Sequence, residues 1–250
     1  PPNFLEVGEA YEYDYDDRNR LIEKIIPGGA THTYDYNEAD MMVGADNGNG
    51  NIVTKYDLFG RPVETGFGSF TAPDIYNITE YLTETFYDNP ILVSSFPNSS
   101  KSTSNDCSST ASLGKVVGTK VKILEESGWI YTTTCYDQYG RSIVSNSTNH
   151  LDGNDQVTST LNLADLPTLI EREHNVFGIP TTEILESFTY DGQLRNQSAS
   201  HQIGDLPANN MTINFNVYNN TDQLLSKRIG AHPSQGIDFL QDIDYKYNAR

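Results

Sequence analysis

The chain is poor in cysteine: Cys107 and Cys135 are its only two thiols in 250 residues. Two separated thiols without a nearby histidine cannot supply the four ligands of a structural zinc site. A Cys107–Cys135 disulfide and two reduced thiols are the remaining alternatives. Sequence does not choose between them, because it does not reveal the Cα separation that a disulfide requires.

Basic residues are scarce as well, and long apolar runs are missing. Sixteen Lys and Arg against 34 Asp and Glu give a formal net charge of −18, which repels phosphate backbones. No run approaches the roughly 18 apolar residues that a membrane-spanning helix needs. The sequence therefore predicts no nucleic-acid partner and no membrane insertion.

Tyrosine, in contrast, is abundant. The chain has 16 Tyr but one Trp and three Met, within a hydrophobic share of 36%. Tyr, Thr, Val, Ile and Phe suit pleated strands, whereas the frequent Asn, Asp and Gly favour turns and interrupt helices. We therefore expect an all-β chain whose interior is built largely from tyrosine.

A short motif recurs along the chain: an aromatic residue, Asp or Asn, two further residues, Gly, and then Arg or Leu. The best copies begin at Tyr56 and Tyr136, and the copy at Tyr15 has Asn in place of Gly. The copy at Tyr190 reads as one residue short and the copy at Tyr218 as one residue long. The residues assigned to this motif are Tyr15, Asp16, Tyr36, Tyr56, Asp57, Gly60, Arg61, Tyr136, Asp137, Gly140, Arg141, Tyr190, Asp191, Tyr218 and Tyr247. A degenerate copy at 161–167 has Leu in place of the aromatic residue.

Each position of the motif suits a β-hairpin. Alternation places the rings of Tyr34 and Tyr36 on one face of a strand, where they are expected to stack on neighbouring rings as aromatic ladders. The following Asp or Asn can accept backbone N–H groups two residues on, and Gly can close the turn at positive φ. The Arg is near enough to pair with the turn Asp. Successive hairpins would add edge to edge, which predicts antiparallel hairpin repeats in an elongated, twisting sheet or partial shell.

The motif divides the chain into three regions. Residues 1–67 and 113–250 carry repeats, and residues 68–112 are predicted to form an irregular, Ser- and Asn-rich excursion loop. Within that loop, residues 76–88 could form one more strand that ends in a Tyr-Asp turn, or a short helix. The glycine-rich segment 46–51 and residues 152–155 are predicted to be hairpin tips.

The spacing of Tyr-Asp-x-x-Gly-Arg at intervals of twenty to thirty residues resembles the YD repeat of RHS proteins, most closely the long secreted RHS proteins of Bacteroidota. This resemblance implies a ribbon of β-sheet that spirals into a shell around a C-terminal effector or toxin of the same polypeptide. Residues 244–250 look like the lead-in to an RHS core that lies outside this chain, and the missing initiator Met suggests an omitted upstream region. Secretion in that phylum often uses the type IX system, so a secreted or cell-surface location is expected.

Catalytic chemistry is not apparent in the sequence. The histidines are scattered singly, and Glu173 and His174 would point to opposite faces of a strand. The acidic group at 14–17 lacks the glycine and terminal glutamate of a calcium loop. We therefore expect no enzyme and no cofactor, although 34 acidic residues leave an unseen carboxylate pair open.

The leading hypothesis is a structural shell or scaffold segment that carries an effector. One alternative is an adhesin or carbohydrate-binding segment, since tyrosine-rich β surfaces can stack on sugars. A further alternative is a secreted substrate captured together with its type IX export machinery. The direction in which the tyrosine rings point discriminates the first two.

Overall fold

The computed structural model describes residues 10–71, 75–97, 110–204, 210–231 and 238–248. They divide into two units, one of residues 1–86 and 119–129, the other of residues 87–118 and 130–250. All secondary structure longer than four residues is β-strand, and all strand pairings between described residues are antiparallel. The predicted all-β, antiparallel class is confirmed.

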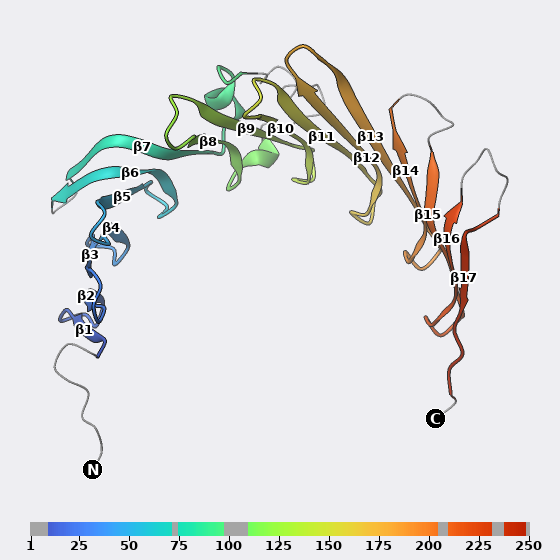
Figure 1. Cartoon of the computed structure of the whole chain (residues 1–250), viewed down its shortest axis with the longest axis horizontal. Coiled ribbons are helices and arrows are strands. Elements are labelled where there is room, and N and C mark those ends of the chain that lie inside the picture. Colours follow the sequence, from blue (N-terminus) through green and yellow to red (C-terminus); the bar gives the residue numbers. More distant parts are fainter. Residues whose placement is uncertain (1–9, 72–74, 98–109, 205–209, 232–237, 249–250) are drawn as a thin grey trace. The chain divides into compact units, whose positions relative to one another are not determined.

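Consecutive strands pair throughout the first unit, blue to cyan in Figure 1. The turns that join them up to residue 61 contain Asp, Asn or Gly, whereas the strands are rich in Tyr, Thr, Val and Ile. The strands are β1 (Glu12–Tyr15), β2 (Leu21–Ile25), β3 (Thr31–Tyr36), β4 (Met42–Asp46), β5 (Asn51–Tyr56), β6 (Pro62–Thr71) and β7 (Ile75–Tyr87).

The second unit repeats this arrangement, with consecutive pairing from β9 to β17. Its hairpins lie side by side in Figure 1. The strands after β8 (Val116–Lys122) are β9 (Trp129–Tyr136), β10 (Ser142–Thr148), β11 (Asn154–Leu161), β12 (Pro167–Val176), β13 (Ile179–Tyr190), β14 (Asn196–Ile203), β15 (Met211–Tyr218), β16 (Leu224–Ala231) and β17 (Gln241–Asp244).

The predicted excursion loop at 68–112 is wrong in its first part. β6 extends to Thr71 and β7 occupies Ile75–Tyr87, because the alternating apolar and polar residues of this segment suit a strand. The alternative of one more strand ending in a Tyr-Asp turn is therefore confirmed. Short 3-10 helices follow it, η1 (Pro90–Val93) and η3 (Thr110–Ser112).

The buried core of the described residues is small and contains no tyrosine. In the first unit Val43 and Val53 are buried on the neighbouring strands β4 and β5. The expectation of a tyrosine interior is wrong, because a single layer of sheet encloses few side chains and leaves the rings half-buried. Within the described residues, no helix is both long and apolar enough to cross a membrane.

The second unit gains a local second layer from the segment after β7. Val93 of η1 and Phe96 are buried, and the Phe96 ring meets the Tyr131 ring edge-on with centroids 5.0 Å apart. A Cβ atom at Gly118 would lie 2.6 Å from the Val93 side chain, so only glycine fits beneath this cover.

Candidate functional site: a ladder of hairpin turns

Seven motif turns share one backbone geometry, which an eighth turn outside the motif, residues 149–153, also adopts with Asp152 at φ 53°. In each motif turn, the N–H of the first residue donates to the carbonyl of the fifth, and the fourth has positive φ, from 60° at Asn19 to 77° at Gly60 and Gly140. We name them by their first residue. The aspartate turns are residues 16–20, 57–61, 137–141 and 191–195, and the asparagine turns are residues 37–41, 162–166 and 219–223.

In the aspartate turns, one carboxylate organises the whole turn. Asp137 Oδ1 accepts the N–H groups of Tyr139 (2.9 Å) and Arg141 (3.0 Å), and Oδ2 accepts Arg141 Nε (2.7 Å). Arg141 Nη2 lies 2.6 Å from the same oxygen, and the side chains of Arg141 and Asp137 are 19% and 14% exposed. Asp16, Asp57 and Asp191 make the same set of bonds with Arg20, Arg61 and Arg195. The predicted pairing of the turn Asp with the motif Arg is confirmed.

These contacts shift the pKa values of the turn carboxylates. The backbone N–H of Arg20 lowers the pKa of Asp16, and the Arg195 side chain lowers the pKa of Asp191. Burial alone would raise the pKa of Asp57 and Asp137, but hydrogen bonds from Arg61 and Arg141 outweigh it and lower both. The four carboxylates are therefore held in their charged form.

In the asparagine turns, an amide oxygen replaces the carboxylate. Asn162 Oδ1 accepts the N–H groups of Ala164 (2.8 Å) and Leu166 (3.1 Å). Asp165 has positive φ (63°) at the fourth position, which Gly140 occupies in the turn at 137–141. The uncharged residues Met41, Leu166 and Gln223 occupy the fifth position. The asparagine turns thus lack their own arginine but present a carboxylate.

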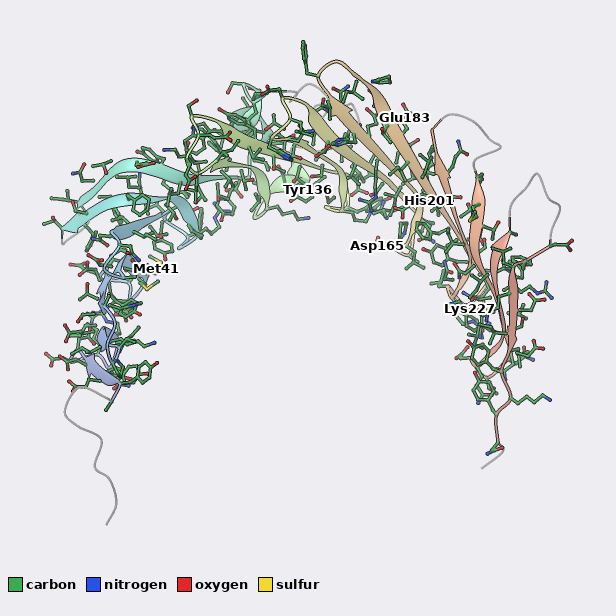
Figure 2. The ribbon with its side chains drawn as sticks, viewed as in Figure 1. Met41, Tyr136, Asp165, Glu183, His201 and Lys227 are labelled. Carbon is green, nitrogen blue, oxygen red and sulfur yellow. The ribbon has the colours of Figure 1, made fainter. Side chains whose placement is uncertain are left out.

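The arginine of an aspartate turn reaches that carboxylate. Arg141 Nη1 donates to the Asn162 carbonyl (2.8 Å) and to Asp165 Oδ1 (2.9 Å), and Figure 2 labels Asp165 at the same edge of the sheet as Tyr136. Arg20 bridges to Asn37 and Asp40 in this way, and Arg195 bridges to Asn219 and Asp222. We call this repeated contact the arginine bridge.

Within each unit, the hydroxyl groups of motif tyrosines also connect neighbouring motif turns. Each donates to the carbonyl of the residue that follows the preceding motif turn: Tyr36 to Leu21, Tyr56 to Met42, Tyr190 to Pro167, Tyr218 to Asn196 and Tyr247 to Leu224, at 2.8 to 3.2 Å. The guanidinium of Arg20 lies 4.7 Å from the Tyr36 ring centroid, and that of Arg195 lies 4.6 Å from the Tyr218 ring.

The predicted aromatic ladders are wrong. Among the described residues, no ring contact joins two tyrosines of the repeat motif, because the rings other than that of Tyr15 lie under a cation or place their hydroxyl on a backbone carbonyl instead. Tyr15 differs from the others: it is 52% exposed and makes no such hydroxyl bond within the described residues.

Two copies that appeared irregular in sequence are regular in the structure. Residues 191–195 form a full aspartate turn, in which Leu194 adopts φ 64° in place of glycine. Residues 219–223 form a full asparagine turn with Asp222 at φ 63°. Neither copy is short or long; the apparent irregularity arose because the fourth position was expected to be Gly.

One motif turn is opened by an insertion. Asp88 N–H donates to the Lys115 carbonyl (3.0 Å), the bond that closes an aspartate turn, and Gly114 N–H donates to Asp88 Oδ1 (2.6 Å). The Lys115 ammonium takes the place of arginine: it donates to the Gly140 carbonyl and lies 4.9 Å from the Tyr136 ring centroid. Tyr136 in turn donates to the Val116 carbonyl (2.8 Å).

Cys135, next to Tyr136, is buried and disulfide-bonded. Cys107 lies outside the described residues, so its pairing with Cys135 stays a prediction. The described residues contain no group of three or more His, Cys, Asp or Glu side chains that could hold a metal ion. An open cavity of about 400 Å³ lies beside the turns at 37–41 and 57–61 and includes Met41, Tyr56 and Tyr76 in its lining.

No family model matches the chain, and no curated protein matches it. Among solved structures, the chain is similar to the TcdB2–TccC3 complex, with a TM-score of 0.40 at 13% identity over 95% of this chain and 14% of that chain. The Photorhabdus luminescens Tc holotoxin pore gives a TM-score of 0.36 at 14% identity over 95% of this chain and 13% of that chain. The chain spans only 13 to 14% of the length of these structures.

Proposed function

We propose that this chain is a structural wall segment of a secreted or cell-surface protein of the RHS/YD-repeat type. The wall carries or encloses an effector or toxin domain outside residues 1–250, and the segment itself has no catalytic role. Its export route, for which the type IX system is the candidate, belongs to the same proposal.

The observation that carries this proposal is the arginine bridge. Arg20, Arg141 and Arg195 each hold their own turn and the next one, so neighbouring hairpins are tied along the turn edge as well as along the strands. Such ties oppose hinging between hairpins. This is the mechanical property that a thin wall needs, because a single sheet layer has little core to stiffen it.

The exposed apolar side chains of the motif turns also support a wall within a larger assembly. Leu58, Phe59, Tyr139 and Leu163 occupy the second and third positions of three turns and are 66 to 103% exposed. An exposed patch of large apolar side chains marks a contact surface, and Leu58 and Phe59 are adjacent in one such turn. A wall whose turn edge meets a further part of the same polypeptide would cover them.

Limited proteolysis of the whole natural polypeptide tests the proposal. We expect a segment outside residues 1–250 to resist trypsin in the native protein, and to be cleaved in a variant that carries Arg141→Ala and Arg195→Ala. Mass spectrometry of the fragments identifies the segment. Equal cleavage of every segment outside residues 1–250 in both proteins would overturn the enclosing role.

A second candidate function, glycan binding, is supported by exposed rings. Tyr13 and Tyr15 on β1 and Tyr11 just before it are 50 to 58% exposed, and Lys24 Nζ lies 5.6 Å from the Tyr11 ring centroid. An aromatic row of this kind can stack on sugar rings. A glycan array on the chain and on its Tyr13→Ala variant tests this function; tyrosine-dependent binding would favour it over the wall.

A further inference from the structure

The hairpin tip between β4 and β5 contains two Asn-Gly pairs in succession, Asn47-Gly48 and Asn49-Gly50. Asn47, Gly48 and Asn49 are exposed, and Gly48 and Gly50 both have positive φ, at 85° and 132°. Gly50 is half-buried, but the two pairs share composition and an exposed asparagine, which makes their hydrogen bonds comparable.

The hydrogen bonds of the two pairs differ. Gly48 N–H donates to Asp46 Oδ1 (2.8 Å), and Asn47 Oδ1 accepts Asn49 N–H (3.0 Å). For Gly50 N–H and the Asn49 carboxamide, the described part of the chain provides no hydrogen-bond partner. In the first pair, both the glycine N–H and the asparagine side chain are therefore hydrogen-bonded, and in the second pair neither group has a partner within the described residues.

We propose that Asn49 is a site of spontaneous deamidation and that Asn47 is protected from it. The Gly50 nitrogen loses its proton to solvent hydroxide and attacks Asn49 Cγ, which forms a cyclic succinimide and releases the side-chain nitrogen as ammonia. Water then opens the ring at either carbonyl and leaves aspartate or isoaspartate. Glycine favours the attack because it has no Cβ to hinder the approach and tolerates the backbone angles of the closing ring.

The same step at Asn47 requires the Gly48 N–H to leave the Asp46 carboxylate. A hydrogen bond to a charged group contributes about 1.5 kcal/mol or more, which corresponds to about a tenfold slower reaction. Deamidation at Asn49 would add a negative charge near Asp46, and isoaspartate would lengthen the backbone beside the Asp46–Asn51 pair that closes the ladder. Deamidation of the hairpin tip would therefore occur mainly at Asn49.

Mass spectrometry of the full chain incubated at mildly alkaline pH tests the proposal. The tryptic peptide that ends at Lys55 contains both pairs, and fragmentation assigns the mass gain to Asn47 or Asn49. We expect conversion at Asn49 about tenfold faster than at Asn47. The Asn49→Gln variant should lose the fast conversion, because glutamine must close a larger ring.

Two controls distinguish protection of Asn47 by the Asp46 hydrogen bond from a difference in the intrinsic rates of the two Asn-Gly pairs. In concentrated urea the two rates should become equal, and Asp46→Ala should raise the Asn47 rate about tenfold in the folded chain. If Asn47 converts as fast as Asn49 in the folded chain, Asn47 is not protected and the proposal is overturned. It is also overturned if Asp46→Ala slows the conversion of Asn47, because Asp46 would then act as a base rather than a protector.

Discussion

The aspartate turn at 137–141 and the asparagine turn at 162–166 have the same backbone and opposite roles. The first contains its own arginine and closes with a glycine, and the second ends in Leu166 and places Asp165 where the glycine would be. Arg141 joins them through Asp165 Oδ1 at 2.9 Å. The two kinds of turn are therefore complementary halves of one contact, rather than a good copy and a poor copy of one motif.

The aspartate side chain therefore stabilises more of the structure than the asparagine side chain does. Loss of the aspartate removes the organising acceptor of its own turn and frees the arginine that holds the next one. Loss of the asparagine removes only local backbone bonds. Changes at aspartate turns should consequently extend into the neighbouring hairpin, and changes at asparagine turns should stay local.

Acidification acts on all the aspartate turns at once, so we expect it to have the largest effect on stability. The folded pKa values of Asp16, Asp57, Asp137 and Asp191 are lowered below the unfolded value of 3.8. A carboxylate of this kind stabilises the fold above its unfolded pKa and loses that contribution as pH falls through its folded pKa. The urea midpoint should stay flat from about pH 6 to about pH 5 and fall steeply below about pH 4. A midpoint that rises on acidification would contradict the turn assignment.

Substitution in one turn of each kind tests the unequal roles directly. Asp137→Ala removes two backbone acceptor bonds and the partner of Arg141, with an expected loss of about 3 kcal/mol in the free energy of unfolding. Asn162→Ala removes two backbone acceptor bonds only and should cost about 1 kcal/mol. Urea unfolding measures both values.

Asp137→Asn is the matched variant, because it converts an aspartate turn into an asparagine turn. The amide oxygen can still accept Tyr139 N–H and Arg141 N–H, so only the ion pair with Arg141 is lost and the cost should be about 2 kcal/mol. A cost equal to that of Asp137→Ala would show that the ion pair, rather than the backbone acceptors, determines the stability of the turn.

Much of the fold was predictable from the sequence, and the bridge was not. Tyrosine, asparagine and glycine usage indicated antiparallel hairpins, and Asp57, Gly60 and Arg61 stood at the spacing that one turn requires. The bridge escaped prediction because it depends on Asp40, Asp165 and Asp222, which replace glycine and so made their copies look degenerate. Alternation of Asp-led and Asn-led copies at 16, 37 and 57, and again at 137, 162, 191 and 219, was the signal that could have revealed it.

The fourth turn position gives the smallest and most local test of the comparison. Leu194 occupies it at φ 64°, a conformation that costs a residue with a Cβ about 1 to 2 kcal/mol. Leu194→Gly should therefore stabilise the chain by about 0.5 kcal/mol after the extra freedom of glycine in the unfolded chain is subtracted.

Gly60→Ala, at φ 77° and with only Met41 Sδ (3.3 Å) near its Cβ position, should destabilise the chain by about 1 kcal/mol. Gly192→Ala provides the control, because Gly192 lies in an aspartate turn with open space around its Cβ position, and its stability should change by less than about 0.5 kcal/mol. Urea unfolding of the three variants separates backbone strain from turn membership. If Gly192→Ala costs as much as Gly60→Ala, the turn resists substitution generally and positive φ is not the reason that glycine recurs in the motif.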